Sequence, residues 1–198
     1  MDVLFQDPDI AVIIKPVGMD SEKELPQALQ AQLGGEFFPV HRLDQNVGGV
    51  MVYARNSSAA ADLSRQIAGG SFIKEYVALV HGAPPETGDW KDLLFKDSRK
   101  NKVFVVKKQR NGVKEARLTY SRLKEGENSL VRIRLYTGRS HQIRVQFASR
   151  GYPLVGDHKY GSRAKETAPY LFSCCLQFNH NGIRRFEKLP DWADSVFV

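Results

Sequence analysis

The sequence predicts an α+β domain, with many short strands and few helices along the chain. Runs of β-branched and apolar residues of strand length recur as far as residue 178, whereas only three segments have the spacing of an amphipathic helix. Nothing repeats at a fixed period, which argues against a solenoid. With 198 residues, 42% of them hydrophobic, the chain can bury a substantial core, and we expect residues 1–198 to form one domain.

The first third of the chain predicts two strands separated by a helix. Residues 10–15 are apolar and β-branched and precede a proline, which is typical of a strand that enters a turn. Residues 24–33 have helical spacing, and Gly34-Gly35 ends that helix. Residues 50–54 form an apolar run of strand length, so Asp44 is expected in the loop that leads into a buried strand.

The rest of the chain predicts two more helices and five more strands. One helix begins at Asn56 or Ser57, whose side chain can cap it, and ends at Gly69-Gly70. The other follows Ser140. The strands are expected at residues 72–80, 102–107, 116–123, 130–135 and 170–178. Asn111-Gly112 is a strong hairpin signal, so we expect the two strands that flank it to pair.

Charge and cysteine content limit the class of protein. The formal net charge of +7 favours a polyanionic partner such as RNA. Cys174 and Cys175 are adjacent, which is unfavourable for the geometry of a structural disulfide and favours free thiols and a reducing compartment. No run of eighteen apolar residues occurs, and the N-terminal segment lacks the pattern of a secretory signal. We therefore expect a cytoplasmic protein without a membrane partner.

Two segments about a hundred residues apart can supply an aspartate and an arginine to one site. Asp44 ends the run His41-Arg42-Leu43-Asp44, and Arg144 lies in residues 138–145. A carboxylate beside a guanidinium stays ionised and can act as a nucleophile or a base. Taken alone, each residue has a plainer interpretation, because an aspartate often caps a turn and an arginine often forms a surface ion pair.

An ordered set of motifs resembles the RluA-type pseudouridine synthases, enzymes that isomerise uridine in RNA. The motifs are His41-Arg42-Leu43-Asp44 followed by Gly48-Gly49-Val50-Met51-Val52-Tyr53-Ala54-Arg55, then Lys74-Glu75-Tyr76-Val77-Ala78-Leu79-Val80-His81-Gly82, residues 138–145, and Gly156-Asp157-His158-Lys159-Tyr160-Gly161. The resemblance spans nearly the whole chain. It implies a pseudouridine synthase fold of the α+β class, with a mixed, largely antiparallel β-sheet, flanking helices and a central RNA-binding cleft.

The same resemblance implies roles for five residues. Asp44 is expected to be the catalytic carboxylate, and Arg144 to pair with it and keep it charged. Tyr76 is expected to stack on uracil and to accept the C5 proton, with a core-filling aromatic as the alternative. Arg42 is expected to help take the uridine out of its stack, or else to contact a phosphate. Leu171 is expected to floor the uracil pocket, or else to be an ordinary core leucine.

The expected function is the site-specific isomerisation of uridine to pseudouridine in structured RNA, either ribosomal or transfer RNA. The resemblance implies no metal and no organic cofactor. We expect a monomer. The alternative from another class is a non-catalytic module that binds or folds RNA and has kept the cleft; a nucleoside hydrolase is disfavoured by the basic charge.

Three sequence features leave room for other roles. His41, His141 and His158 lack a compact metal-binding pattern, so a structural or RNA-contacting role is favoured. The segment from Pro84 to Lys114 is the densest basic stretch, and it is either a solvated hairpin or an arm that follows phosphates. Gln45-Asn46-Val47 departs from the family pattern after Asp44, which affects local packing and substrate choice rather than the type of reaction.

Overall fold

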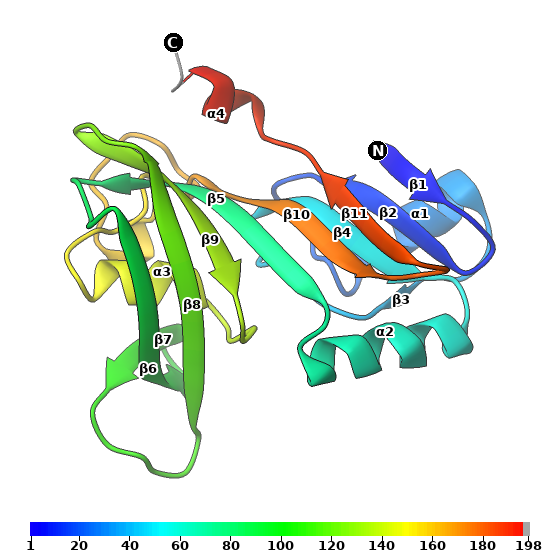
Figure 1. Ribbon diagram of the computed structural model, residues 1–198, viewed down its shortest axis with the longest axis horizontal. Coiled ribbons are helices and arrows are strands. Elements are labelled where there is room, and N and C mark those ends of the chain that lie inside the picture. Colours follow the sequence, from blue (N-terminus) through cyan, green and yellow to red (C-terminus); the bar gives the residue numbers. More distant parts are fainter. Residues whose placement is uncertain (196–198) are drawn as a thin grey trace. The chain divides into compact units, whose positions relative to one another are not determined.

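The computed structural model describes residues 1–195, which divide into two compact units (Figure 1). Unit 1 comprises Met1–Lys74 and Phe172–Pro190, and unit 2 comprises Glu75–Leu171 and the residues from Asp191 onward. Each unit is described by itself, and the expectation of one domain over residues 1–198 stays a prediction.

Unit 1 is a mixed sheet with two helices. Its elements are β1 (Val3–Gln6), β2 (Ile10–Lys15), α1 (Glu24–Leu33), β3 (Phe38–Pro39), β4 (Gly48–Ala54), α2 (Ser57–Gly69), most of β10 (Leu171–Asn179) and β11 (Ile183–Glu187). The strands follow the order β1-β2-β4-β10, with β3 paired to β4 and β11 paired to β10. The β4–β10 pair is parallel, whereas the other pairs in this unit are antiparallel.

Strand β4 is the centre of unit 1, and all seven of its residues are buried. Val52 of β4 packs with Leu63 of α2 and Phe178 of β10 in the core of this unit. The parallel contact with β10 requires a glycine at its start, because Gly49 has φ +126° and any side chain there would overlap the backbone of Ser173. Strand β4 therefore enters the core at a fixed position directly after the Asp44 loop.

Unit 2 contains five paired strands and a short helix that covers them. Its elements are the greater part of β5 (Ile73–His81), β6 (Thr87–Asp97), β7 (Lys102–Val106), β8 (Val113–Lys124), β9 (Asn128–Leu135), α3 (Gln142–Ala148), the 3₁₀ helix η1 (His158–Tyr160) and α4 (Asp191–Ser195). The strand order is β5-β9-β8-β6-β7. Phe147 of α3 lies against Trp90 of β6 and Tyr120 of β8, with ring centroids 4.6 and 5.2 Å away, so α3 covers one face of this sheet.

The prediction that the strands beside Asn111-Gly112 pair with each other is wrong. Strand β6 lies between β7 and β8 and pairs antiparallel with both. Gly112 does adopt the left-handed conformation of a turn, with φ +79°. Strand β6 escaped prediction because one of its faces is polar and exposed, which makes the segment after Pro84-Pro85 look like a loop.

The other expected elements agree with the structure. Helix α1 has the predicted bounds, and α2 is capped by the Asn56 side chain, which accepts a hydrogen bond from the Ala59 backbone N–H. Cys174 and Cys175 are both buried. The mixed pairing and flanking helices confirm an α+β fold. Within the described residues, no helix is both long and apolar enough to span a bilayer.

Candidate active site

Asp44 lies in unit 1, on the loop between β3 and β4. It begins a tight turn, in which the Val47 backbone N–H donates to the Asp44 carbonyl oxygen at 2.9 Å. The residue before it, Leu43, is 4% exposed and anchors the loop in the core. Asp44 itself is half-buried, so its carboxylate is held by a fixed backbone without being sealed from a ligand.

The buried side chain of Lys15 holds the same loop in place. Its side chain is 1% exposed, and Nζ donates to the carbonyl oxygens of Pro16, Gln45 and Val47 at 2.9, 3.0 and 2.8 Å. Burial lowers the pKa of Lys15 to about 8, against the opposing effect of nearby carboxylates that include Asp44. Lys15 is thus mainly protonated at neutral pH and places a positive charge near Asp44. Sequence reasoning missed this role, although Lys15 directly precedes a proline turn.

A second anchor ties the loop to the segment before α1. Ser21 Oγ donates to the Leu43 carbonyl oxygen at 3.0 Å and accepts from the Leu43 N–H at 3.3 Å. The Tyr53 hydroxyl in β4 donates to the Ser21 carbonyl oxygen at 2.6 Å. Burial raises the pKa of Tyr53, so this hydroxyl keeps its proton. Both sides of the Asp44 turn are therefore bonded to buried groups.

His41 has a structural role in the same loop. Its Nε2 accepts a hydrogen bond from the Val52 N–H at 3.2 Å, and its ring packs 5.7 Å from the ring of Phe72. Burial, with a smaller effect of the Lys74 charge, lowers the pKa of His41 to about 3. The imidazole is therefore neutral at physiological pH and joins the loop to β4.

Arg42 lies at the surface of unit 1. Its Nη1 is 2.6 Å from Glu22 Oε2, and the two side chains are 62% and 46% exposed. An ion pair this exposed adds at most about 1 kcal/mol to stability. Arg42 can accordingly exchange Glu22 for a phosphate at little cost.

Arg144 lies in α3 of unit 2 and forms a buried, two-pronged ion pair with Asp157. The Nε–Oδ2 distance is 2.6 Å and the Nη2–Oδ1 distance is 2.8 Å, and the side chains are only 10% and 1% exposed. Sequence reasoning singled out the motif that contains Asp157 but gave this aspartate no role. Its pairing fixes the orientation of the Arg144 guanidinium.

Tyr160 completes the surroundings of Arg144. The guanidinium carbon of Arg144 lies 5.2 Å from the centre of the Tyr160 ring. The Tyr160 hydroxyl is 2.9 Å from His141 Nδ1 and accepts from the Val103 N–H at 2.9 Å. His141 is thereby placed in a hydrogen-bond network of unit 2 rather than in a set of metal ligands.

Tyr76 and Leu171 also belong to unit 2, on β5 and at the first position of β10. They are 6% and 7% exposed, so each offers only a small surface to a ligand. This unit thus contains three of the predicted site residues, Tyr76, Arg144 and Leu171, while unit 1 contains Asp44 and Arg42. That all five act together stays a prediction.

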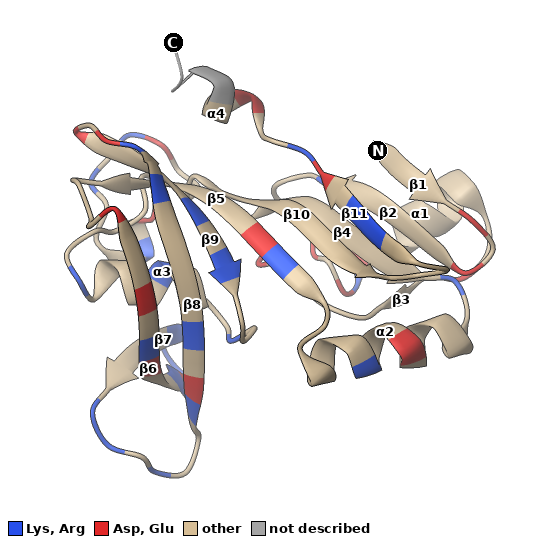
Figure 2. Cartoon of the chain, viewed as in Figure 1, with Lys and Arg blue, Asp and Glu red and all other residues tan. Residues whose placement is uncertain are grey.

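The basic stretch lies on the outer strands of unit 2. Lysine and arginine residues occur at the end of β6, along β7 and in the loop before β8 (Figure 2). Lys100, Lys107, Lys108 and Arg110 are exposed, whereas Lys102 is half-buried and its Nζ lies 5.3 Å from the centre of the Tyr160 ring. Both earlier interpretations, a solvated edge and an arm for phosphates, fit this exposure.

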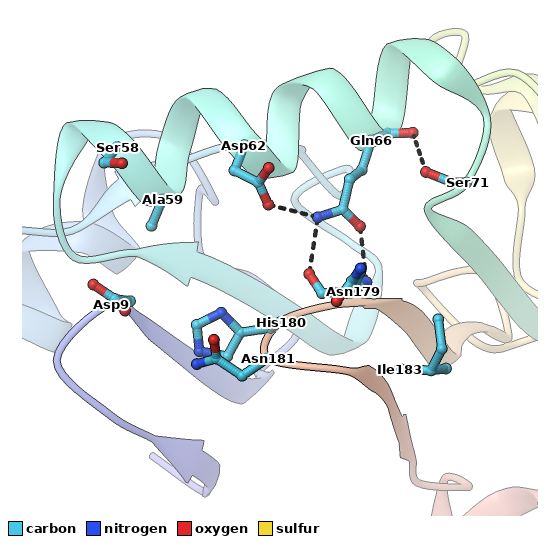
Figure 3. Close-up of a pocket in the computed structure, with 10 residues that line it drawn as sticks. All are labelled: Asp9, Ser58, Ala59, Asp62, Gln66, Ser71, Asn179, His180, Asn181 and Ile183. Atoms are coloured by element: carbon cyan, nitrogen blue, oxygen red, sulfur yellow. Dashed lines mark hydrogen bonds between the residues drawn. The ribbon is translucent and has the colours of Figure 1, made fainter.

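A polar pocket of about 490 Å³ in unit 1 contains none of the predicted site residues (Figure 3). It lies between α2 and the turn that joins β10 to β11. Gln66 on α2 donates to Asp62 and to the Asn179 carbonyl oxygen at 2.7 and 2.8 Å, and accepts from the Asn179 N–H at 2.8 Å. These bonds join the helix to the turn, which is a structural explanation for the polar lining.

One group of side chains in the described residues has the composition of a metal site. Ligand atoms of Asp7, Asp9 and His180 lie within 4.8 Å of one another. Each is engaged in a bond of the fold: Asp7 accepts from His180 Nε2 at 2.6 Å and from the N–H groups of Asp9 and Ile10, and Asp9 accepts from Asn56. The group explains how the β1–β2 turn is held.

Comparisons with known proteins agree with these motifs. Residues 9–149 match the sequence profile of the RNA pseudouridylate synthase family, and the chain belongs to that family. The matched stretch contains Asp44, Tyr76 and Arg144.

Three curated relatives illustrate the range of the family. An uncharacterized RNA pseudouridine synthase of Aquifex aeolicus (strain VF5) is 34% identical, over 90% of this chain and 62% of the relative. Ribosomal large subunit pseudouridine synthase D of Zymomonas mobilis is 32% identical, over 89% of this chain and 61% of the relative. tRNA pseudouridine synthase C of Haemophilus ducreyi is 32% identical, over 81% and 74%. The chain thus spans about three fifths of the length of the first two.

Solved structures show the same fold. Human RNA pseudouridylate synthase domain containing 1 matches with a TM-score of 0.86 at 21% identity, over 98% of this chain and 85% of that chain. Human RNA pseudouridylate synthase domain containing 4 matches with a TM-score of 0.81 at 22% identity, over 96% and 89%. The predicted pseudouridine synthase fold is therefore confirmed.

Proposed function

We propose that this chain isomerises uridine to pseudouridine in RNA, with Asp44 as the catalytic carboxylate. The observation that carries the proposal is the family match over residues 9–149, combined with the rigid support of the Asp44 loop by Lys15 and Ser21. The match supplies the class of reaction. The hydrogen bonds hold the Asp44 loop in one position before the substrate binds. Substrate binding therefore does not have to supply the free energy of ordering this loop.

The reaction exchanges one bond for another within a single nucleotide. The bond between ribose C1′ and uracil N1 breaks, the base turns, and a bond between C1′ and C5 forms. C5 loses its proton and N1 gains one, so substrate and product have the same composition and no redox change occurs. The protein must hold the detached uracil throughout and must accept the C5 proton.

Asp44 must be ionised for its first step. Attack on ribose C1′, attack on the uracil ring and removal of a ribose proton all use a carboxylate, and all require that it be held against the nucleotide. The ammonium of Lys15 lies near this carboxylate. Arg144 is proposed to pair with Asp44 while Asp157 holds the guanidinium from its other side.

The remaining residues are proposed to handle the base. Tyr76 stacks on uracil and accepts the C5 proton, while Leu171 supplies apolar surface to the pocket. Flipping a uridine out of its stack costs a few kcal/mol, which stacking in a pocket can offset. Arg42 contributes by contacting the opened strand, since its ion pair with Glu22 is weak.

The proposed substrate is a uridine in structured ribosomal or transfer RNA. Relatives of this chain are named for both kinds of RNA. The net charge of +7 and the exposed basic residues of the β6–β8 region suit a phosphate backbone. We further propose that the protein works in the cytoplasm as a monomer, with no metal or organic cofactor.

Tritium release tests the proposal. Ribosomal and transfer RNA transcripts carrying [5-³H]uridine are incubated with the protein, and tritium in the solvent is counted, because the C5 proton leaves only if isomerisation occurs. Release above the level of an Asp44→Asn control supports the isomerase. RNA binding without release from either class of transcript would support the non-catalytic RNA-binding module instead.

A further inference from the structure

Unit 2 presents one sheet face that no described helix of this unit covers, and an exposed aromatic residue lies on it. Alternate residues of a strand point to opposite faces. Trp90, Leu118 and Leu135 form one row across β6, β8 and β9 and belong to the face packed against α3. The neighbouring row is Lys91, Arg117 and Tyr136, which lies on the opposite face.

Tyr136 directly follows β9 and is 45% exposed. Its N–H donates to the Arg117 carbonyl oxygen at 3.1 Å, which keeps the backbone in register beyond the end of the strand. Two guanidinium groups lie on its ring: that of Arg117 is 4.5 Å and that of Arg134 is 5.3 Å from the ring centre. An exposed tyrosine is thus held in place by its backbone and by two cations.

The two arginines differ in what holds them. Arg117 is fixed by Asp89, with Nε–Oδ1 at 3.0 Å and Nη2–Oδ2 at 2.8 Å, so its plane is oriented. Arg134 is exposed and, within residues 1–195, has no carboxylate at ion-pair distance. Lys91 lies opposite Arg117 in the register and is exposed as well. The face therefore combines an oriented aromatic and guanidinium surface with two further cations: Lys91, whose charge acts on Asp89, and Arg134, which has no carboxylate at ion-pair distance among the described residues.

We propose that Tyr136, with Arg117 and Arg134, forms a stacking site for an unpaired RNA base, distinct from the proposed uracil pocket. A nucleotide base stacks on an aromatic ring or on a guanidinium plane, and its phosphate can contact a neighbouring free cation. A paired duplex hides the faces of its bases, so the partner is a single-stranded segment. The choice of RNA as the polymer rests on the proposed function.

The site would add a contact away from the proposed uracil pocket. Arg144 lies in α3 and Tyr136 lies on the opposite face of the sheet, so the base stacked on Tyr136 would belong to a more distant part of the same RNA strand. Tyr136 lies two residues before Gly138, in the stretch that leads to Arg144, so a base bound there would be placed by the same unit as Arg144. The plainer explanation, a surface cation–π cluster that only stabilises the sheet, predicts no effect on RNA affinity.

The test measures binding of a fluorescein-labelled twelve-nucleotide oligouridylate by fluorescence anisotropy, with the intact chain at fixed ionic strength. Tyr136→Ala is expected to weaken binding about fivefold or more, because stacking is worth roughly 1–3 kcal/mol per base. Tyr136→Phe keeps the ring and should stay within about twofold, whereas Tyr136→Leu keeps bulk without a π-face and should behave like alanine. Leu123→Ala removes a comparably exposed side chain from β8, 44% exposed, and serves as the matched control.

A second readout locates the contact. Irradiation of the complex with the same oligonucleotide carrying 5-iodouridine should crosslink to Tyr136, as mapped by mass spectrometry of the digested protein. Equal affinity of wild type, Tyr136→Ala and Leu123→Ala, or an undiminished yield of crosslinking in Tyr136→Ala, would overturn the inference. Binding that depends on Tyr136 in a protein that releases no tritium would refute the proposed isomerase and leave the stacking site standing, so the two failures can be told apart.

Discussion

Lys15 and Gln45 are joined by a hydrogen bond of 3.0 Å from the buried ammonium to a backbone carbonyl, across thirty residues of sequence. Gln45 directly follows Asp44, so the bond fixes the loop of the proposed catalytic carboxylate relative to β2. A lysine is the only common side chain that can donate to three carbonyl oxygens from one atom, and this one does so.

Asp44→Asn is expected to abolish isomerisation, because the amide cannot act as a nucleophile or a base at neutral pH. Affinity for RNA should remain within a few fold, since the side chain is half-buried and has the same shape. Tritium release and filter binding on the same transcripts measure the two effects. Full activity of this variant would remove Asp44 from the mechanism.

The lowered pKa of Lys15 leads us to expect a loss of activity at alkaline pH. Above its pKa of about 8 the ammonium becomes an amine, with two N–H donors for three carbonyls and no charge near Asp44. Single-turnover tritium release should therefore fall between pH 7.5 and 9.5. Lys15→Met should be at least tenfold slower at pH 7 and should lack this alkaline decline.

The linked change in stability has the opposite sign. The pKa of Lys15 is about 8 in the folded chain and has its ordinary value of 10.5 in the unfolded chain. Between these two pH values the unfolded chain therefore binds more protons than the folded chain. This group therefore favours folding more as pH rises from about 8. Circular dichroism should show a folded protein while activity falls, and a parallel loss of structure would contradict the local explanation.

Asp157→Asn is expected to destabilise the fold by about 3 kcal/mol and to reduce turnover. Breaking a buried ion pair by removing one partner leaves a buried charge without compensation, at a cost of about 3–5 kcal/mol, and the amide recovers part of it. Urea denaturation measures the change in unfolding free energy. Glu22→Gln removes the carboxylate of an exposed pair and should cost less than about 1 kcal/mol.

His41 predicts a sensitivity of the fold to acid. Its pKa is about 3 in the folded chain and 6.5 in the ordinary state, so the unfolded chain gains a proton first as pH falls below about 6.5. The stability from this group is fully present above that pH and is lost toward pH 3, by at most about 1.4 kcal/mol per pH unit. Urea denaturation at pH 7, 6 and 5 should show a steeper decline for wild type than for His41→Gln. If the unfolding free energy declined equally with pH in both proteins, His41 would gain its proton in the folded chain.

The basic arm predicts a change in the salt dependence of RNA binding. Removing both charges in Lys100→Gln/Lys102→Gln should reduce the slope of log affinity against log salt by up to about 1.4, or 0.7 per phosphate contact with a single strand. Lys165→Gln/Lys188→Gln removes the same charge elsewhere and is the control. An unchanged slope would leave this segment as ordinary solvated surface.

The sequence predicted those elements in which local pattern and tertiary role agree. Helix α2 has an Asn56 cap, an apolar stripe and a terminal glycine, and its bounds follow from those residues alone. Strand β6 has none of these signals, because Thr87, Asp89 and Lys91 place polar residues at every second position on the face opposite α3. The pairing of β6 between β7 and β8 depends on contacts across unit 2 that no short window of sequence contains.

The sequence predicted the residues of the candidate site better than the residues that hold them in place. Asp44, Tyr76 and Arg144 stand in motifs, and a motif can be recognised without a fold. The supports are a lysine, a serine and an aspartate whose function arises from burial: Lys15, Ser21 and Asp157 become buried only when distant segments come together. Burial of a polar side chain cannot be inferred from its neighbours in sequence, which is why these three residues escaped prediction.

The contact between Gly49 and Ser173 has a consequence for how the protein is made. During translation the Asp44 loop leaves the ribosome well before β10 is synthesised, so in the growing chain the start of β4, at Gly48 and Gly49, still lacks its pairing with β10. An apolar edge in that state invites pairing with other nascent chains. The Asp44 loop is consequently among the last parts of the molecule to gain its final surroundings, even though it is encoded near the start of the message.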